Sequence, residues 1–88
     1  MNLLPNSNPQ QPWWVYIVEC VDGTFYTGIT TDINKRIKKH NSGDGAKYTR
    51  SRCPVQLLYY EEHKNRSSAT KREIEIKKLS RDQKRELI

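Results

Sequence analysis

Two aromatic and β-branched segments, separated by Asp22-Gly23, constrain the fold of this chain most strongly. Residues 13–20 and 24–30 are rich in Trp, Tyr, Val, Ile and Thr, the residue types that favour strands. The Asp-Gly pair between them is a turn signal. The sequence therefore predicts a β-hairpin in the first third of the chain.

The number of residues in the turn decides which side chains share a face of the hairpin. A two-residue turn would send Tyr16 and Tyr26 to opposite faces of the sheet. A three-residue loop that ends with Gly23 in the left-handed region instead pairs Tyr16 with Gly28, so that both phenols project from one face. We prefer the three-residue loop as a hypothesis. It leaves room for another group to approach the backbone at Gly28, and the other face then collects a core layer of Val15, Ile17, Phe25 and Ile29.

The next segment, residues 33–42, predicts a helix that Thr31 or Asp32 caps and that a glycine ends. The spacing of its two isoleucines gives a buried stripe along the helix. Arg36 and His40 lie on the edge of that stripe. We expect both side chains to face the hairpin and still reach solvent.

A glycine-rich and basic segment, residues 43–52, follows this helix. It holds too many Gly and polar residues for a regular element. We interpret it as a loop that contacts phosphate groups, with Tyr48 available for stacking. The chain has 16 Lys and Arg against 10 Asp and Glu, and this net charge of +6 favours a polyanionic partner. The predicted nucleic-acid contacts are Gly28, Lys39, Lys47, Tyr48, Arg50, Arg52 and Arg72.

The C-terminal part predicts a third strand, over residues 55–61, and two helices. We expect Ser67 or Ser68 to cap the first of these helices. Its inward side carries Ala69, Ile76 and Leu79, with Arg72 at the rim. A capping box, Ser80-Arg81-Asp82-Gln83, opens the last helix, which ends near Ile88.

Glu73 has two alternative roles on the first of these helices. It falls about 60° from Ile76 around the helix, on the side that looks toward the hairpin. It also stands four residues before Lys77, where an ion pair stabilises a helix by a few tenths of a kcal/mol. From spacing alone, the ion pair is the favoured interpretation.

The chain has the size and composition of one small domain. Its 88 residues contain 34 % hydrophobic side chains, enough for one small core. Residues 1–12 are rich in Pro, Asn and Gln and predict a flexible extension, so the domain spans residues 13–88. Cys20 and Cys53 fit neither a zinc site nor a disulfide framework.

Nothing in the sequence points to a membrane. No apolar run reaches the roughly 18 residues that cross a bilayer, and no charged leader precedes an apolar stretch. We therefore expect a cytoplasmic protein with no membrane partner, and we favour a monomer.

The ordered set of polar and aromatic residues resembles the GIY-YIG nuclease superfamily. The residues that carry the resemblance are Val15-Tyr16-Ile17, Tyr26-Thr27-Gly28, Arg36, His40 and Glu73, and the match runs from about Trp13 to Ile88. The chain is most similar to the small stand-alone bacterial YhbQ-like branch. That similarity rests on Gly45-Ala46-Lys47-Tyr48-Thr49-Arg50 and on Ile76-Lys77-Lys78-Leu79-Ser80-Arg81.

The resemblance implies an α+β fold, a small three-stranded antiparallel sheet flanked by helices. It also implies hydrolysis of DNA phosphodiester bonds with one divalent cation, Mg²⁺ or Mn²⁺. RNA is the alternative nucleic acid. By position, Tyr16 would accept the proton of the attacking water and Tyr26 would position water or phosphate. Arg36 would neutralise the phosphoryl oxygens, His40 would assist proton transfer or bind phosphate, and Glu73 would hold the metal.

Two function classes stay open at this point. Many family members carry an Asn beyond the metal-binding Glu, whereas residues 74–88 of this chain contain none. The first class is an endonuclease that acts in DNA repair or recombination. The second is a nucleic-acid-binding module that keeps the fold and turns over weakly or not at all. An accessory domain that depends on a protein partner is a third possibility.

Overall fold

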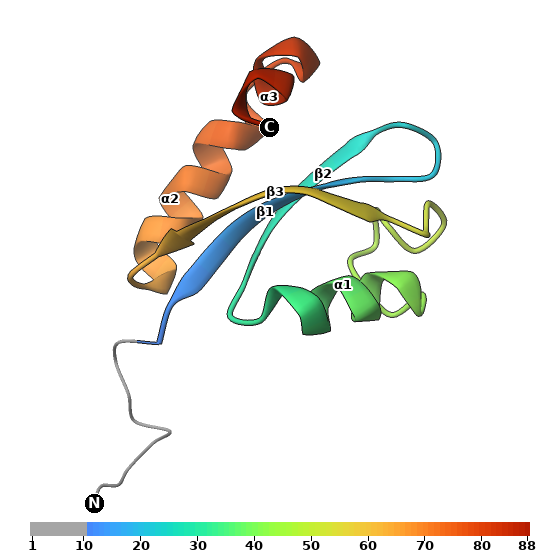
Figure 1. The fold of residues 1–88 in the computed structure, drawn as a ribbon, viewed down its shortest axis with the longest axis horizontal. Coiled ribbons are helices and arrows are strands. Elements are labelled where there is room, and N and C mark those ends of the chain that lie inside the picture. The colour runs from blue at the N-terminus through green and yellow to red at the C-terminus, as the bar shows by residue number, and fades with distance from the viewer. Residues whose placement is uncertain (1–10) are drawn as a thin grey trace, which may run out of the picture.

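The computed structural model describes residues 11–88 as a three-stranded sheet with three helices (Figure 1). The extension predicted for residues 1–12 lies outside the described residues, except for its last two. In chain order the elements are β1 (Trp13–Glu19), β2 (Phe25–Thr30), α1 (Ile33–Asn41), β3 (Gln56–His63), α2 (Arg66–Lys77) and α3 (Arg81–Leu87). The α+β fold class is confirmed, and among residues 11–88 no helix is long and apolar enough to cross a bilayer.

The sheet is antiparallel, with strand order β2-β1-β3. The three-residue loop of the hairpin is confirmed, because Gly23 has a φ of 83° and Tyr16 pairs with Gly28. Val18 pairs with Tyr26, two residues along. Since side chains alternate between faces along a strand, this register puts both phenols on one face of the sheet.

The two faces of the sheet carry different cores, and a helix covers each (Figure 1). On the α2 face, the buried residues are Val15, Ile17, Ala69 and Ile76, with Phe25 and Ile29 packed against them. The core layer expected from the hairpin is therefore confirmed. On the α1 face, the buried residues are Tyr16, Val18, Cys20 and Val55, with Tyr26, Ile37 and Leu57 packed around them. Tyr16 and Tyr26, the two phenols with predicted roles in the reaction, thus lie on the α1 face.

Polar side chains fix where each helix begins. Asp32 caps α1 by accepting a hydrogen bond from the Lys35 amide at 3.0 Å. The prediction that Ser67 or Ser68 caps α2 is wrong. Asn65 is the cap, because its backbone is extended and its side chain accepts from the Ser68 amide at 2.8 Å. The capping box of α3 is present as predicted.

Candidate functional site

A buried chain of hydrogen bonds connects β1, α1 and the loop that follows α1. The Tyr16 hydroxyl lies 2.8 Å from Nε2 of His40, and Nδ1 of His40 lies 2.7 Å from Oγ1 of Thr49. Oγ1 of Thr49 in turn donates to the Ala46 carbonyl at 3.0 Å. The side chains of Tyr16, His40 and Thr49 are each at most 1 % exposed. The network is therefore shielded from bulk water.

The pattern of donors assigns the protons in this network. A threonine hydroxyl has one hydrogen, and Thr49 donates it to the Ala46 carbonyl. Oγ1 of Thr49 must then accept from Nδ1–H of His40, which leaves Nε2 without a proton. Consequently Tyr16 donates its hydroxyl proton to Nε2 of His40. We assign the imidazole tautomer from the network in this way.

The burial of His40 corrects the expectation that it lies on a solvent-reaching helix edge. His40 is fully buried because residues 43–52 fold back over the last turn of α1. Gly45 makes that approach possible, since a Cβ there would lie 2.7 Å from the Cα of His40. Helical periodicity places a residue on one side of a helix, but it does not reveal a loop that covers the same side.

A column of rings leads from this buried network to the surface. The rings of His40 and Tyr26 lie 5.5 Å apart, and Tyr48 stacks on Tyr26 at 6.0 Å. Tyr48 is 38 % exposed, and the Arg52 guanidinium lies 4.0 Å from the centre of its ring. Arg52 also forms an ion pair with Asp22 at 3.0 Å. Tyr48 and Arg52 are thus held in place by contacts within the chain.

Burial and one cation set the protonation states of the network. Burial raises the pKa of Tyr16 to about 12; Arg36 opposes this rise, while Tyr26 and Glu73 add to it. Burial together with the charge of Arg36 lowers the pKa of His40 to about 4. Near neutral pH, Tyr16 therefore keeps its proton and His40 is uncharged.

Glu73 both forms an ion pair on its own helix and lies near Tyr16. It forms the ion pair with Lys77, at 3.2 Å, that spacing favours. Its side chain is also 19 % exposed and lies close enough to Tyr16 to raise the pKa of that phenol. Arg36 and Glu73 thus place opposite charges near the same hydroxyl.

The donor set around Tyr16 fits a hard divalent cation that keeps most of its water. Within residues 11–88, no three His, Cys, Asp or Glu side chains converge as a metal cage. Glu73 offers one carboxylate near Tyr16. Mg²⁺ commonly binds through one or two carboxylates, with water and substrate phosphate as its other ligands. Lys77 contacts one oxygen of that carboxylate, Oε2, and competes with a cation for it.

The structure separates the predicted nucleic-acid contacts into groups. Lys39, Lys47 and Arg50 are exposed on the helix α1 and the loop after it. The room expected at Gly28 is filled, because a Cβ there would lie 2.6 Å from the Tyr16 hydroxyl oxygen. Arg72 lies apart from Tyr16, on the α2 face, where it pairs with Glu61 at 3.0 Å.

Two residues of the site were assigned no role from sequence, namely Thr49 and Gly45. Thr49 orients His40, and Gly45 admits the loop that buries it. Both stand in the segment Gly45–Arg50 that carries the family resemblance, and that resemblance is the signal that could have pointed to them.

Comparisons with known proteins show what this chain is similar to. The model of the GIY-YIG catalytic domain matches residues 12–86. A UPF0213 protein of Desulfotalea psychrophila is 54 % identical over 90 residues, covering 100 % of this chain and 82 % of that protein. One from Halobacterium salinarum is 56 % identical over 73 residues, covering 83 % of this chain and 95 % of that protein. The solution structure of a UPF0213 protein from Bacillus halodurans is 50 % identical, with a TM-score of 0.55, and covers 86 % of this chain and 81 % of that one.

Proposed function

Since the chain belongs to the GIY-YIG family of nuclease domains, we propose that it is a divalent-metal-dependent endonuclease that hydrolyses phosphodiester bonds of DNA. The observation that supports this proposal most is the buried relay from Tyr16 to His40 beside Arg36. A phenol that is hydrogen bonded to a neutral imidazole can receive one proton while it passes on another.

Tyr16 is the residue that takes the proton of the attacking water in this proposal. Because Tyr16 is only 1 % exposed in the protein alone, the proposal requires its hydroxyl to become accessible to one water when DNA binds. Its raised pKa means that the phenol is protonated before reaction, so it is not a preformed base. It acts instead as a relay: its oxygen receives the proton of the water while its own proton moves to Nε2 of His40. Thr49 holds the imidazole in the tautomer that leaves Nε2 free to accept.

His40 acts as the proton acceptor and not as a phosphate ligand. Its side chain is fully buried, and both ring nitrogens have partners within the chain. In the protein alone, burial and Arg36 lower the pKa of His40. A bound phosphodiester brings negative charge beside Arg36, which offsets the effect of the guanidinium and raises the proton affinity of the imidazole.

Arg36 and Glu73 have opposite charges and different roles at the phosphate. Arg36 stays protonated and can donate two parallel hydrogen bonds to phosphoryl oxygens. Glu73, released by Lys77, would hold Mg²⁺ or Mn²⁺ together with water and substrate oxygens. The bound cation supplies Lewis-acid polarisation of the phosphoryl oxygen and makes neighbouring water more acidic. Tyr26 orients the water or phosphate beside Tyr16.

The DNA strand is proposed to lie over α1 and the loop that follows it. Lys39, Lys47 and Arg50 are exposed there, and Tyr48 offers the outermost ring of the column. Phosphate contacts by such cations make binding salt-dependent. Damaged or branched DNA is the proposed substrate, because a domain of this size has little surface for reading base sequence.

The experiment is a cleavage panel over single-stranded, duplex, nicked and branched DNA, and a matching RNA, with Mg²⁺ or Mn²⁺. Wild-type protein should produce new ends, and Glu73→Gln should abolish them while it retains binding. Glu75→Gln is the matched control, because Glu75 lies on the same helix, is 66 % exposed and pairs with Arg72 instead. Equal cleavage by Glu73→Gln and Glu75→Gln would contradict the proposal.

The binding module without turnover is the second candidate, and the Glu73–Lys77 ion pair favours it. Lys77 competes with a cation for the Glu73 carboxylate and so opposes metal binding. In that case DNA stays intact throughout the panel, while binding still weakens as salt rises. The cleavage panel separates the two candidates, since new DNA ends that appear with Mg²⁺ or Mn²⁺ and disappear in Glu73→Gln are expected only of a nuclease.

A further inference from the structure

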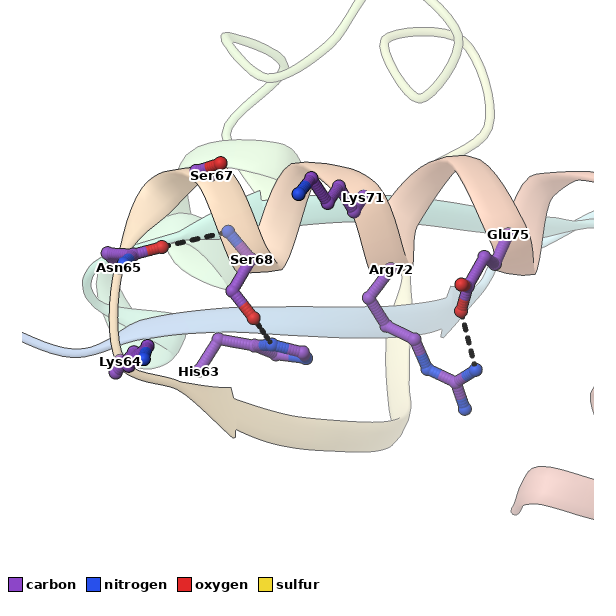
Figure 2. A pocket seen from close by; sticks show the side chains of 8 residues that line it. All are labelled: His63, Lys64, Asn65, Ser67, Ser68, Lys71, Arg72 and Glu75. Atoms are coloured by element: carbon purple, nitrogen blue, oxygen red, sulfur yellow. Dashed lines mark hydrogen bonds and ion pairs between the residues drawn. The ribbon is translucent and has the colours of Figure 1, made fainter.

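On the α2 face, away from Tyr16, three side chains form a hydrogen-bonded row. Oγ of Ser68 lies 2.6 Å from Nδ1 of His63, and Nε2 of His63 lies 2.6 Å from Oε2 of Glu61. Figure 2 shows Ser68, in the first turn of α2, pointing at the His63 ring from the end of β3. The order of hydroxyl, imidazole and carboxylate is that of an activated serine.

The protons of this row are fixed by the carboxylate. An ionised carboxylate only accepts, so Nε2 of His63 carries a hydrogen and donates it to Glu61. For a neutral imidazole, Nδ1 is then the acceptor, and the Ser68 hydroxyl donates to it. Burial raises the pKa of Glu61, but hydrogen bonds from Tyr59, His63 and Arg72 outweigh burial and lower the pKa below its usual value. Glu61 is therefore ionised and orients His63.

Ser68 opens into a cavity of about 360 Å³. Three cations line the cavity, Lys64, Lys71 and Arg72, against one carboxylate, Glu75 (Figure 2). This volume suits a small ligand, and the excess of positive charge selects an anionic one. The half-buried Ser68 can be reached from the cavity. Arg72 is paired with Glu61 and Glu75, so the positive charge that can stabilise an oxyanion there comes from Lys64 and Lys71.

We propose that Ser68 is a nucleophile that hydrolyses small carboxylic esters bearing an anionic group. Its Oγ bonds to the ester carbonyl carbon as the proton of the hydroxyl moves to Nδ1 of His63. The bond from that carbon to the leaving oxygen then breaks, and the alkoxide takes the proton from His63. Water, deprotonated by His63, attacks the acyl-serine, so that the carboxylic acid leaves and Ser68 regains its proton.

This activity is independent of DNA cleavage, because Ser68 and Tyr16 lie on opposite faces of the sheet. A purely structural role for Ser68, as a clamp between α2 and β3, is the competing account. Only a nucleophile forms a covalent bond with an electrophile. Covalent labelling therefore separates the two accounts.

The first measurement is labelling by a fluorophosphonate, with the modified residue located by peptide mass spectrometry. Wild-type protein should be modified at Ser68. Ser68→Ala should lose the adduct, and His63→Gln should react about 100-fold more slowly because the base is missing. Ser67→Ala is the matched control: Ser67 lines the same cavity, and it should label like wild type.

The second measurement is release of 4-nitrophenol, above the rate without protein, from two esters, the mono-4-nitrophenyl ester of terephthalic acid and 4-nitrophenyl benzoate. The anionic terephthalate ester should react faster, and Lys71→Ala should remove that preference. Ser68→Ala should stop ester turnover and leave DNA cleavage unchanged. The proposal is overturned if folded wild-type protein gains no adduct, if Ser67 is modified as readily as Ser68, or if His63→Gln labels at the wild-type rate.

Discussion

Acidification should destabilise this protein through His40, and the size of the effect follows from its burial and from the charge of Arg36. The pKa of His40 is lowered from 6.5 to about 4, whereas the unfolded chain keeps the ordinary value. As the pH falls through 6.5, the unfolded state binds a proton that the folded state does not accept. The free energy of unfolding must therefore fall between pH 6.5 and pH 4.

The magnitude is large for a domain of this size. At pH 5 an unperturbed histidine is almost fully protonated, while His40 remains mostly neutral. The linkage relation then gives a loss of about 2 kcal/mol between pH 7.5 and pH 5. Small domains are stable by only about 5 to 15 kcal/mol in total. Below pH 5, Asp22 and Glu61, whose pKa values are lowered, begin to add losses of their own.

The assay is urea unfolding at pH 7.5, 6 and 5, followed by the fluorescence of Trp13 and Trp14 on β1. The comparison variant is His40→Gln, whose amide oxygen can accept from Tyr16 but does not titrate. The free energy of unfolding of His40→Gln should stay nearly constant over this range, although at pH 7.5 it is lower than that of the wild type. His63 is present in both proteins, so it does not contribute to the difference between their free energies of unfolding. If the two proteins lose the same free energy between pH 7.5 and pH 5, His40 is not held neutral and the proposed network is wrong.

Four further predictions concern the same network. Tyr16 should ionise near pH 12 in a spectrophotometric titration of the tyrosines, and Tyr16→Phe should remove the amplitude of one tyrosine from the late part of the curve. Tyr59, whose pKa is also raised by its hydrogen bond to Glu61, contributes equally in both proteins, and an unchanged late amplitude in the variant would refute this prediction. Stability should fall as pH rises from 10 toward 12, since the unfolded phenol ionises first. Gly28→Ala should lower the free energy of unfolding by about 1 to 3 kcal/mol, because the new Cβ displaces the Tyr16 phenol; an unchanged melting temperature would contradict it. Thr49→Val should cost about 1 to 3 kcal/mol, since it leaves Nδ1–H of His40 without an acceptor. Thr49→Ser should restore most of that loss, and equal stability of the two variants would count against the assigned tautomer.

Local features of the chain predicted the hairpin, the helices and a third strand, whereas the antiparallel sheet of three strands was implied by the family resemblance. The Asp22-Gly23 signal left two registers open, and the structure has the preferred one, in which a loop of three residues places Tyr16 opposite Gly28. The alternation of side chains then gave the core layer on the α2 face. These predictions rest on interactions between residues near in sequence, where turn chemistry and periodicity act directly.

The site could be predicted only in part, because its geometry depends on contacts between distant segments. The burial of His40 comes from a loop that returns over α1, and no period in the helix signals that return. Glu73 showed the same ambiguity in the structure as in the sequence, since Lys77 and Tyr16 both lie near it. The helix cap at Asn65 was missed because Ser67 and Ser68 compete for that role in the sequence, and only the extended backbone at Asn65 decides it.

The most direct test of the central claim is the single-turnover rate of DNA cleavage by Tyr16→Phe with Mg²⁺ or Mn²⁺. Tyr60→Phe is the control, because Tyr60 lies opposite Tyr16 on β3 and is 55 % exposed. Loss of the relay hydroxyl should slow cleavage about 100-fold or more without weakening DNA binding, while the control cleaves at the wild-type rate. Equal rates for Tyr16→Phe and Tyr60→Phe, in a wild type that cleaves, would contradict the proton relay.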